Sequence, residues 1–159
     1  VKGLGDHSKA LVNLQPGTRV FIEGPYGIFT SQNAQRGRHV LLVGGGVGIT
    51  PLRAIMEEFP NNTQIDVMYR ASRDEDLVLR KELDELSDRI GERVHYLVGS
   101  RHDHPMTAEY IKTFVPQFAD AEIYICGPEP LVTAVKKAAE GAGVPKDRFH
   151  DEAFAFHGD

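Results

Sequence analysis

The chain has 159 residues, an ordinary share of apolar and charged side chains and a formal net charge of −5, which suits one globular domain with an appendage. The negative charge and the lack of a basic stripe argue against nucleic acid as a partner, and no apolar stretch reaches the length of a membrane span or resembles a secretory signal. The single cysteine, Cys126, excludes an internal disulfide and a cysteine zinc cluster, which suits a reducing, cytoplasmic setting. The chain itself requires no membrane contact, and it is expected to be cytoplasmic either in a soluble protein or as the cytoplasmic domain of a membrane protein.

Residues 1–30 differ in pattern from the rest of the chain. Ser8–Leu14 is expected to form a short helix, and Thr18–Glu23 alternates as a strand does before a run of turn residues. This part is too small to be a domain, and Val1 is neither a start methionine nor part of a signal. We therefore expect residues 1–30 to be the trailing end of a unit that lies upstream, and residues 31–159 to be a domain of their own.

Residues 31–159 alternate between apolar runs of strand length and segments with helical spacing. The expected strands are His39–Val43, Gln64–Tyr69, Arg93–Val98, Glu122–Cys126 and Phe149–Phe156. The expected helices are Pro51–Phe59, Asp76–Arg89, Thr107–Val115 and Glu129–Gly141. This order predicts an α/β fold, a five-stranded parallel sheet with helices on both faces. Ligands of such sheets bind at the carboxyl ends of the strands.

The segment after the first of these strands carries the strongest functional signal: Gly44-Gly45-Gly46-Val47-Gly48-Ile49-Thr50-Pro51. Consecutive glycines end the strand and leave backbone N–H groups that no side chain masks. Thr50 is expected to cap a helix that begins at Pro51. A bare turn followed by a helix N-terminus suits a pyrophosphate, although the spacing differs from the usual dinucleotide fingerprint. The alternative is a turn that only connects two elements.

Five blocks occur along the chain in one order: Gly5-Asp6-His7-Ser8, Glu23-Gly24-Pro25-Tyr26-Gly27, Val43 to Pro51, Tyr124-Ile125-Cys126-Gly127-Pro128 and Phe149-His150-Asp151-Glu152-Ala153-Phe154. In order and spacing they resemble the ferredoxin–NADP reductase family, most closely its branch of ferric reductases and NADPH oxidases. The resemblance implies a Rossmann-like NAD(P)-binding domain over 31–159, whose glycine loop holds the pyrophosphate. It also implies that 1–30 is the C-terminal remnant of an FAD-binding barrel, most of which is missing because the barrel's Arg-x-Tyr-Ser motif is absent.

The resemblance further implies that the loop after the second strand meets the adenosine ribose. Arg70, Ser72 and Arg73 lie in this loop, and Arg80 follows seven residues after Arg73. A hydroxyl and guanidinium groups suit a 2′-phosphate, which favours NADPH over NADH. Asp74-Glu75-Asp76 comes directly after Arg73 and is expected to cap and bias the next helix. A solvated, charged helix start is the alternative for the whole loop.

Cys126 is similar to the family's cysteine beside the nicotinamide, and we assign it packing and hydride alignment rather than nucleophilic chemistry. Gly127 and Pro128, with Glu129 after them, would let the nicotinamide approach the start of the last helix.

Glu152 matches a carboxylate near the flavin, and Phe154 matches the aromatic residue that covers the flavin ring. The chain runs on past the expected aromatic end, so Phe156 is a second candidate for stacking, and a core role for these aromatic residues is the alternative. Ser8, assisted by Lys2, resembles the flavin-side residue that holds FAD phosphate.

His102-Asp103-His104 is interpreted as a solvated turn and not a metal site, because no third and fourth ligands are evident. The function that these residues predict is hydride transfer from NADPH to N5 of FAD. Single electrons would then pass to a haem in an upstream membrane domain, to ferric iron or to oxygen. Two alternatives remain: the NADH-dependent reductase component of an oxygenase system, and a nucleotide-binding regulatory module without redox turnover.

Overall fold

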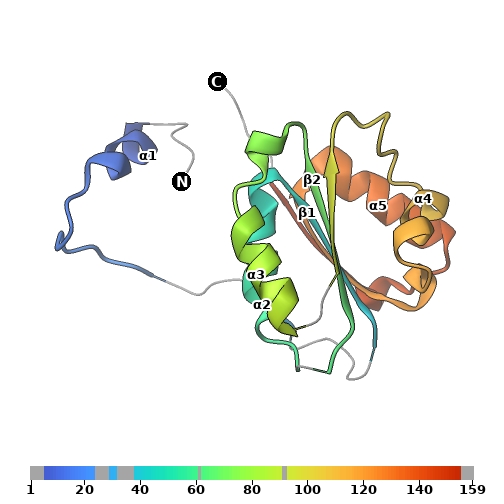
Figure 1. Ribbon diagram of the computed structural model, residues 1–159. Coiled ribbons are helices and arrows are strands. Elements are labelled where there is room, and N and C mark those ends of the chain that lie inside the picture. Colours follow the sequence, from blue (N-terminus) through green and yellow to red (C-terminus); the bar gives the residue numbers. More distant parts are fainter. Residues whose placement is uncertain (1–5, 24–28, 32–37, 61, 91–92, 155–159) are drawn as a thin grey trace.

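The computed structural model describes residues 6–23, 29–31, 38–60, 62–90 and 93–154 (Figure 1). The strands are β1 (Val40–Gly45), β2 (Ile65–Ala71), β3 (Arg93–Val98), β4 (Glu122–Pro128) and β5 (Phe149–Phe154). The α-helices are α1 (Asp6–Ala10), α2 (Ile49–Met56), α3 (Arg80–Ile90), α4 (Ala108–Phe114) and α5 (Glu129–Gly141). Short 3-10 turns lie at Leu11–Asn13, Gly46–Gly48, Asp74–Asp76, Phe118–Asp120 and Lys146–Arg148.

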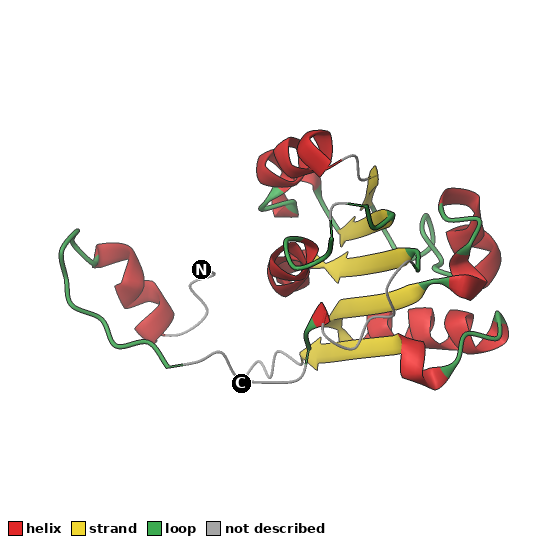
Figure 2. Cartoon of the chain, turned by 90° about the horizontal axis from the view of Figure 1, so that it is seen from below, coloured by secondary structure: helices red, strands yellow, loops and turns green. Residues whose placement is uncertain are grey.

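All four strand pairs are parallel, and the strands lie in the order β3-β2-β1-β4-β5. Helices α2 and α3 cover one face of the sheet, and α4 and α5 cover the other (Figure 1). Figure 2 shows the strands between these two helical layers. The predicted five-stranded parallel sheet is therefore confirmed. Because a parallel sheet is covered on both faces, its strands must be apolar on both sides, and every residue of β1 is buried.

Alternate residues of β1 feed two separate cores. Leu42 packs with Leu52 of α2 and Leu83 of α3 on one face. Leu41 packs with Ile111 of α4 and with residues of α5 on the other. The two cores fix the strands between the helical layers and leave the strand ends as the places where loops can bind a ligand.

Two helix starts differ from the predicted ones. The N-cap of α2 is Gly48, so Thr50 lies inside the helix, where its hydroxyl donates to the carbonyl of Val47 at 2.9 Å. The prediction that Thr50 caps a helix beginning at Pro51 is wrong, because the 3-10 turn Gly46–Gly48 runs directly into the helix; Pro51 still lies in the first turn, where a missing N–H is tolerated. Helix α3 begins at Arg80 and not at Asp76, because Asp74–Asp76 forms a 3-10 turn that ends in a non-helical Leu77.

The first part of the chain forms the expected short helix, as α1 and the 3-10 turn that follows it. The strand predicted over Thr18–Glu23 is not formed: these residues are exposed and have no regular structure. A strand needs a partner for its backbone groups, and no described strand pairs with this segment. The division of the chain at residues 30 and 31 stays a prediction. None of the helices in the described ranges combines the length and the apolar character that a membrane crossing needs.

Candidate functional site

The predicted site residues gather at the carboxyl edge of the sheet. In the strand register, Gly44 lies opposite Tyr69 of β2 on one side and Cys126 of β4 on the other. The glycine loop that follows β1 therefore lies between the ends of β2 and β4. The loop after β2 and the segment from β4 into α5 flank it, as a nucleotide laid across the sheet requires.

Most glycines of this loop are needed for close packing. A Cβ atom on Gly48 would lie 2.1 Å from the carbonyl oxygen of Cys126, and one on Gly45 would lie 2.8 Å from the ring of Pro128. A Cβ on Gly127 would in turn lie 3.2 Å from the backbone of Gly45. A Cβ on Gly44 would meet Ile49, the first residue of α2, at 2.9 Å. The loop and the end of β4 thus touch backbone to backbone, which fixes the loop against Cys126.

Gly46 differs from its neighbours because the space that a side chain at this position would occupy is open in the described part of the structure. Its φ of +55° is a left-handed conformation that glycine adopts without strain, and a Cβ built on it meets no atom of the described residues within 4 Å. Val47 beside it is exposed, and so is Thr50 in the first turn of α2. An open backbone cradle at a helix N-terminus fits a pyrophosphate, because the backbone N–H groups and the dipole at such an end both favour an anion.

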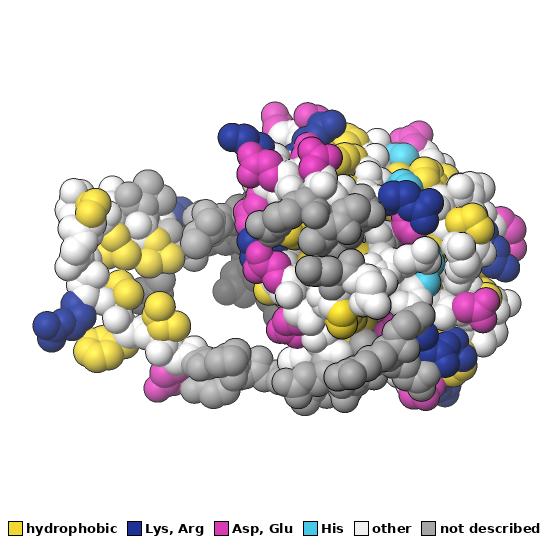
Figure 3. Space-filling model, turned by 60° about the horizontal axis from the view of Figure 1, so that its bottom comes forward, with side chains coloured by type: hydrophobic (Ala, Val, Ile, Leu, Met, Phe, Trp, Pro, Cys, Tyr) yellow, Lys and Arg dark blue, Asp and Glu magenta, His cyan; other side chains and the backbone are white. Residues whose placement is uncertain are grey.

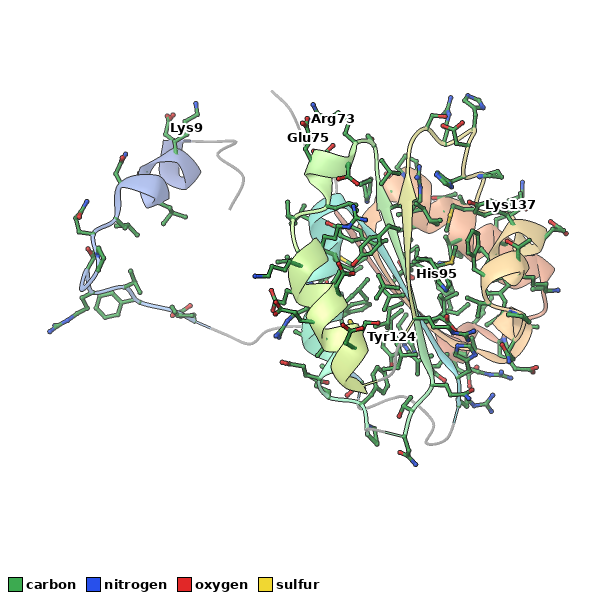
Figure 4. All side chains as sticks on the ribbon, in the orientation of Figure 1. Lys9, Arg73, Glu75, His95, Tyr124 and Lys137 are labelled. Atoms are coloured by element: carbon green, nitrogen blue, oxygen red, sulfur yellow. The ribbon has the colours of Figure 1, made fainter. Side chains whose placement is uncertain are left out.

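The loop after β2 brings Arg73 and Arg80 to this edge, but each already has carboxylate partners. Arg73 contacts Glu75 at 2.5 Å and Asp76 at 3.2 Å, and Figure 4 shows Arg73 and Glu75 together at the upper end of the sheet. Arg80 contacts Asp74 at 2.7 Å. Ser72 is exposed. The three carboxylates outnumber the two guanidinium groups, so the local charge does not favour a second phosphate.

The structure does not bring Arg70 together with these arginines. Its guanidinium donates to the carbonyl oxygens of Leu97 and Gly99, at the end of β3. Burial lowers the pKa of Arg70, and the nearby Tyr110 and Asp103 oppose this effect. Arg70 therefore anchors the end of β3 and the loop that follows.

The His102–His104 segment is tied into the same loop. Asp103 accepts hydrogen bonds from the backbone N and the hydroxyl of Ser100, both at 2.8 Å. His104 contacts the hydroxyl of Tyr110 at 2.5 Å through Nδ1 and the carbonyl of Val98 at 2.9 Å through Nε2. Both ring nitrogens of His104 are therefore engaged within the protein.

Cys126 lies at the end of β4 and is 3% exposed. Burial, and then the negative charge of Glu152, raises the pKa of Cys126 to about 12. The thiol is therefore protonated at neutral pH, which agrees with a packing role and not with nucleophilic chemistry. Glu152 lies opposite Cys126 in the strand register and is exposed. Both thus lie beside the glycine loop.

The remaining predicted residues are placed less fully. Phe154 lies opposite Pro128 in the register, and Pro128 is the exposed N-cap of α5, which begins at Glu129. Ser8 lies in α1. The side chains of Phe154 and Ser8, and the whole of Lys2 and Phe156, are outside the described residues.

Two buried carboxylates at the opposite, amino edge of the sheet were missed by the sequence reasoning. Asp66 is 1% exposed and is contacted by His39 at 2.7 Å, Arg93 at 2.9 Å and His95 at 3.0 Å. Burial alone would raise the pKa of Asp66, but the hydrogen bonds from the two histidines and the charge of Arg93 outweigh it and hold the pKa well below its usual range. Glu122 is equally buried. The sequence could have indicated both carboxylates, because each belongs to an acidic residue inside an otherwise apolar run of strand length.

Comparison with known proteins agrees with this geometry. The model of the oxidoreductase NAD-binding domain family matches residues 42–137. NADH-cytochrome b5 reductase 1 of Aspergillus terreus is 34% identical over 96% of this chain and 58% of its own length. The glycine betaine monooxygenase reductase subunit of Pseudomonas aeruginosa is 29% identical over 89% of this chain and 42% of its own length. The chain therefore spans about half the length of these relatives.

Among solved structures, the ferredoxin-NADP+ reductase of Plasmodium falciparum superposes with a TM-score of 0.77 over 94% of this chain and 65% of its own, at 18% identity. At that identity the match supports the fold alone. The family model covers more than half of the chain and includes the glycine loop and the end of β4. The chain thus belongs to the ferredoxin–NADP reductase family, of which it carries the oxidoreductase NAD-binding domain.

Proposed function

We propose that this domain binds a nicotinamide dinucleotide across the carboxyl edge of its sheet and presents it to FAD held by a flavin-binding region of the complete protein. The coenzyme supplies a hydride when bound, and the flavin accepts it. The observation that carries the proposal is the open cradle at Gly46, fixed by backbone contact to the strand end at Cys126.

In this proposal the chain binds and orients the coenzyme and does no covalent chemistry. Gly44–Gly48 would hold the pyrophosphate at the start of α2 through backbone N–H groups, and Thr50 would join them when its hydroxyl turns from the carbonyl of Val47 to the phosphate. Cys126 and Gly127 would form the surface against which the nicotinamide lies, and the protonated thiol leaves that surface without a charge. Glu152 is the nearest carboxylate along the register and would face the flavin side.

We propose NADH as the preferred coenzyme, where the sequence alone favoured NADPH. A 2′-phosphate would have to displace Asp74, Glu75 or Asp76 from the guanidinium groups that they contact. An acidic residue after the second strand suits the ribose hydroxyls of NADH. The Aspergillus terreus relative is named for NADH, which supports the same choice.

Calorimetric titration of the chain with NADH and with NADPH at low salt tests this choice. We expect tighter binding of NADH. A triple replacement, Asp74→Ser with Glu75→Ser and Asp76→Ser, should free both arginines from these carboxylates and improve NADPH binding by about tenfold or more, because a hydrogen bond to a charged group contributes about 1.5–3 kcal/mol. Glu85→Ser removes an exposed ion pair with Lys81 on α3 and is the matched control. Tighter NADPH binding by the unchanged chain would overturn the proposal.

The electron acceptor and the rest of the protein are also proposals. The P. aeruginosa relative is named as the reductase subunit of a monooxygenase, which favours a soluble oxygenase component as acceptor over the haem-containing membrane domain, ferric iron or oxygen first expected. Residues 6–23 expose Phe21 at 94% and Ile22 at 87%, and Figure 3 shows apolar side chains gathered on this segment. Such residues suit the end of a barrel that needs its other strands.

Rapid mixing of the flavin-loaded holoenzyme with NADH under anaerobic conditions tests hydride transfer. Bleaching of the flavin absorbance with saturating dependence on NADH is expected. Tight NADH binding without any bleaching would instead indicate a regulatory module without redox turnover.

A further inference from the structure

The last strand, β5, lies at the edge of the sheet and has a sequence that specifies its register weakly. Among the described strands it pairs with β4 alone. Its middle residues are His150, Asp151 and Glu152, so neither face of the strand is uniformly apolar. Register is strongly specified only where one face is apolar and buried, and slippage is easier elsewhere. A specific contact must therefore hold β5 in place.

A buried polar pair supplies such a contact at the amino end of the strand. The ring Nε2 of His150 donates to Oε1 of Glu122 at 2.6 Å, and Glu122 is 1% exposed. The His150 ring also stacks on Tyr124, which lies directly opposite it in the register, with centroids 4.5 Å apart and planes 23° from parallel. Figure 4 shows Tyr124 at the lower part of the sheet, away from Arg73 and Glu75.

The buried carboxylate of Glu122 depends on His150 for the hydrogen bond that offsets its loss of contact with water. Its second oxygen, Oε2, is buried and has no hydrogen-bond partner within the part of the chain that the structure describes. A slip of β5 would leave the carboxylate buried and unpaired, which is strongly unfavourable. The pair can form only in the observed register, so it excludes the neighbouring ones.

On the other face of β5, Phe149 packs against the core, but the polar contacts are weaker. Lys136 of α5 lies 3.9 Å from Asp151 and 5.9 Å from the centre of the Phe149 ring. Lys136 and Asp151 are both solvent-accessible, and exposed ion pairs of this kind contribute little. The pair of Glu122 and His150 is therefore the main polar determinant of the register.

We propose that Glu122 and His150 are positioning residues, whose pair sets the register of β5 and thereby places Glu152 opposite Cys126 and Phe154 opposite Pro128. The inference rests on the proposed function, because these two positions matter for a nicotinamide and a flavin. A slip by one residue would shift each by about 3.3 Å and turn it to the other face. A slip by two residues would keep the face but move Glu152 about 6.6 Å from Cys126.

The register can be read without any activity, because Cys126 is the only cysteine in the sequence. Glu152→Cys introduces a thiol on the neighbouring strand at the position opposite Cys126, within the span that a disulfide bridges. We expect this variant to cross-link under a mild oxidant. Asp151→Cys, one residue out of register, is the control and should cross-link poorly. Better cross-linking from position 151 than from position 152 would overturn the proposal at once.

The test removes the pair from the Glu152→Cys chain by a double replacement, Glu122→Leu with His150→Leu. Replacing both partners leaves no uncompensated buried charge, so the chain should fold with an unchanged or higher Tm. We expect the initial rate of cross-linking to fall by about tenfold, as one hydrogen bond to a charged group can shift an equilibrium that far. An unchanged rate in a folded double variant would overturn the role in register.

Two single variants test the same hydrogen bond if the double variant does not fold. Glu122→Gln is the conservative one, because it removes the charge and keeps the acceptor. The amide oxygen still accepts from Nε2 of His150, so the cross-linking rate should stay near that of the parent. His150→Phe keeps the stacking on Tyr124 but loses the donor, and should cross-link slowly. Equal rates for these two variants would refute the hydrogen bond as the determinant.

The flavin-loaded holoenzyme, with Glu152 restored, then separates positioning from mere stability. We expect the double leucine variant to lose about a hundredfold in kcat, because misplacement by about 1 Å can cost that much, while KM for NADH stays unchanged. Slow cross-linking with unchanged kcat would refute the positioning role. If the parent holoenzyme itself did not reduce its flavin, the proposed function would fail, and the cross-linking result on the register would still stand.

Discussion

Alanine at Gly46 should weaken coenzyme binding strongly while lowering the stability of the fold only modestly. The backbone of Gly46 is left-handed, with φ at +55°, and an L-residue in that conformation costs about 1–2 kcal/mol. Among the residues that the structure describes, none has an atom within 4 Å of a Cβ at this position, so no clash with them adds to this strain. At about 2–4 °C per kcal/mol for a domain of this size, Tm should fall by about 2–8 °C.

The added methyl would project into the space assigned to the pyrophosphate. Overpacking by one methyl group typically costs about 1–3 kcal/mol, which weakens binding by about five- to 150-fold. Gly143→Ala is the matched control, because Gly143 also has a positive φ, +82°, and a Cβ added to it would meet no described atom within 4 Å. Gly143 follows α5 and lies away from the glycine loop, so this variant should lose similar stability and keep full affinity for NADH.

Gly48→Ala should show the opposite behaviour. A Cβ there would lie 2.1 Å from the carbonyl oxygen of Cys126, and neither backbone can move without separating the loop from β4. We expect a loss of about 3 kcal/mol or more, which exceeds the loss in the other two variants. Thermal unfolding by circular dichroism and calorimetric titration with NADH measure both effects. Parental affinity in Gly46→Ala, or parental Tm in Gly48→Ala, would refute the assignment of the cradle.

Three further predictions concern buried or anchored groups. The folded pKa of Asp66 lies below its ordinary value of 3.8, so its contribution is complete at neutral pH and is lost as the pH falls below that value. Urea unfolding should show Asp66→Asn about 3 kcal/mol less stable at pH 7, with a gap that narrows in acid; a constant gap would contradict the assignment. The pKa of Cys126 is raised from 9.0 to about 12 in the folded chain. At pH 8 its reaction with a thiol reagent should therefore be about a thousandfold slower in the folded than in the unfolded chain. Equal rates would show that the folded chain carries an accessible thiolate. Arg70→Lys should cost about 1–2 kcal/mol of stability by losing a carbonyl contact at the end of β3 and should leave NADH affinity unchanged, whereas a loss of affinity would restore Arg70 to the coenzyme site.

The sequence was sufficient for the sheet and the glycine loop because both depend on local patterns. The first four strands begin or end within about two residues of their apolar runs, since a parallel strand covered on both faces must be apolar throughout. The end of α5 was predicted from Gly141 and the residues after it for a similarly local reason. The start of α3 was not predicted correctly. The helical spacing of apolar residues continues through Leu77, but the backbone of that residue is not helical, with a ψ of +67°.

The roles of charged residues could not be read in the same way. Arg70, Arg73 and Arg80 look alike in the sequence, yet one binds carbonyls of β3 and the others bind the carboxylates between them. Asp66 meets its partners 27 and 29 positions away, and only the strand register brings these residues together. Without the strand register, the sequence shows which residues are charged but not which charged groups lie close enough to form ion pairs.

The two edges of the sheet are linked through the strands themselves. The buried pair of Glu122 and His150 lies at the amino ends of β4 and β5, and Cys126 and Glu152 lie along the same strands toward the loop. A paired strand transmits a shift along its length without reducing it, so a slip of about 3.3 Å at the pair is a slip of the same size at the site. The pair at the amino ends can therefore set where Glu152 and Phe154 lie at the carboxyl edge, beside a glycine loop that is held by its own backbone contacts with β4.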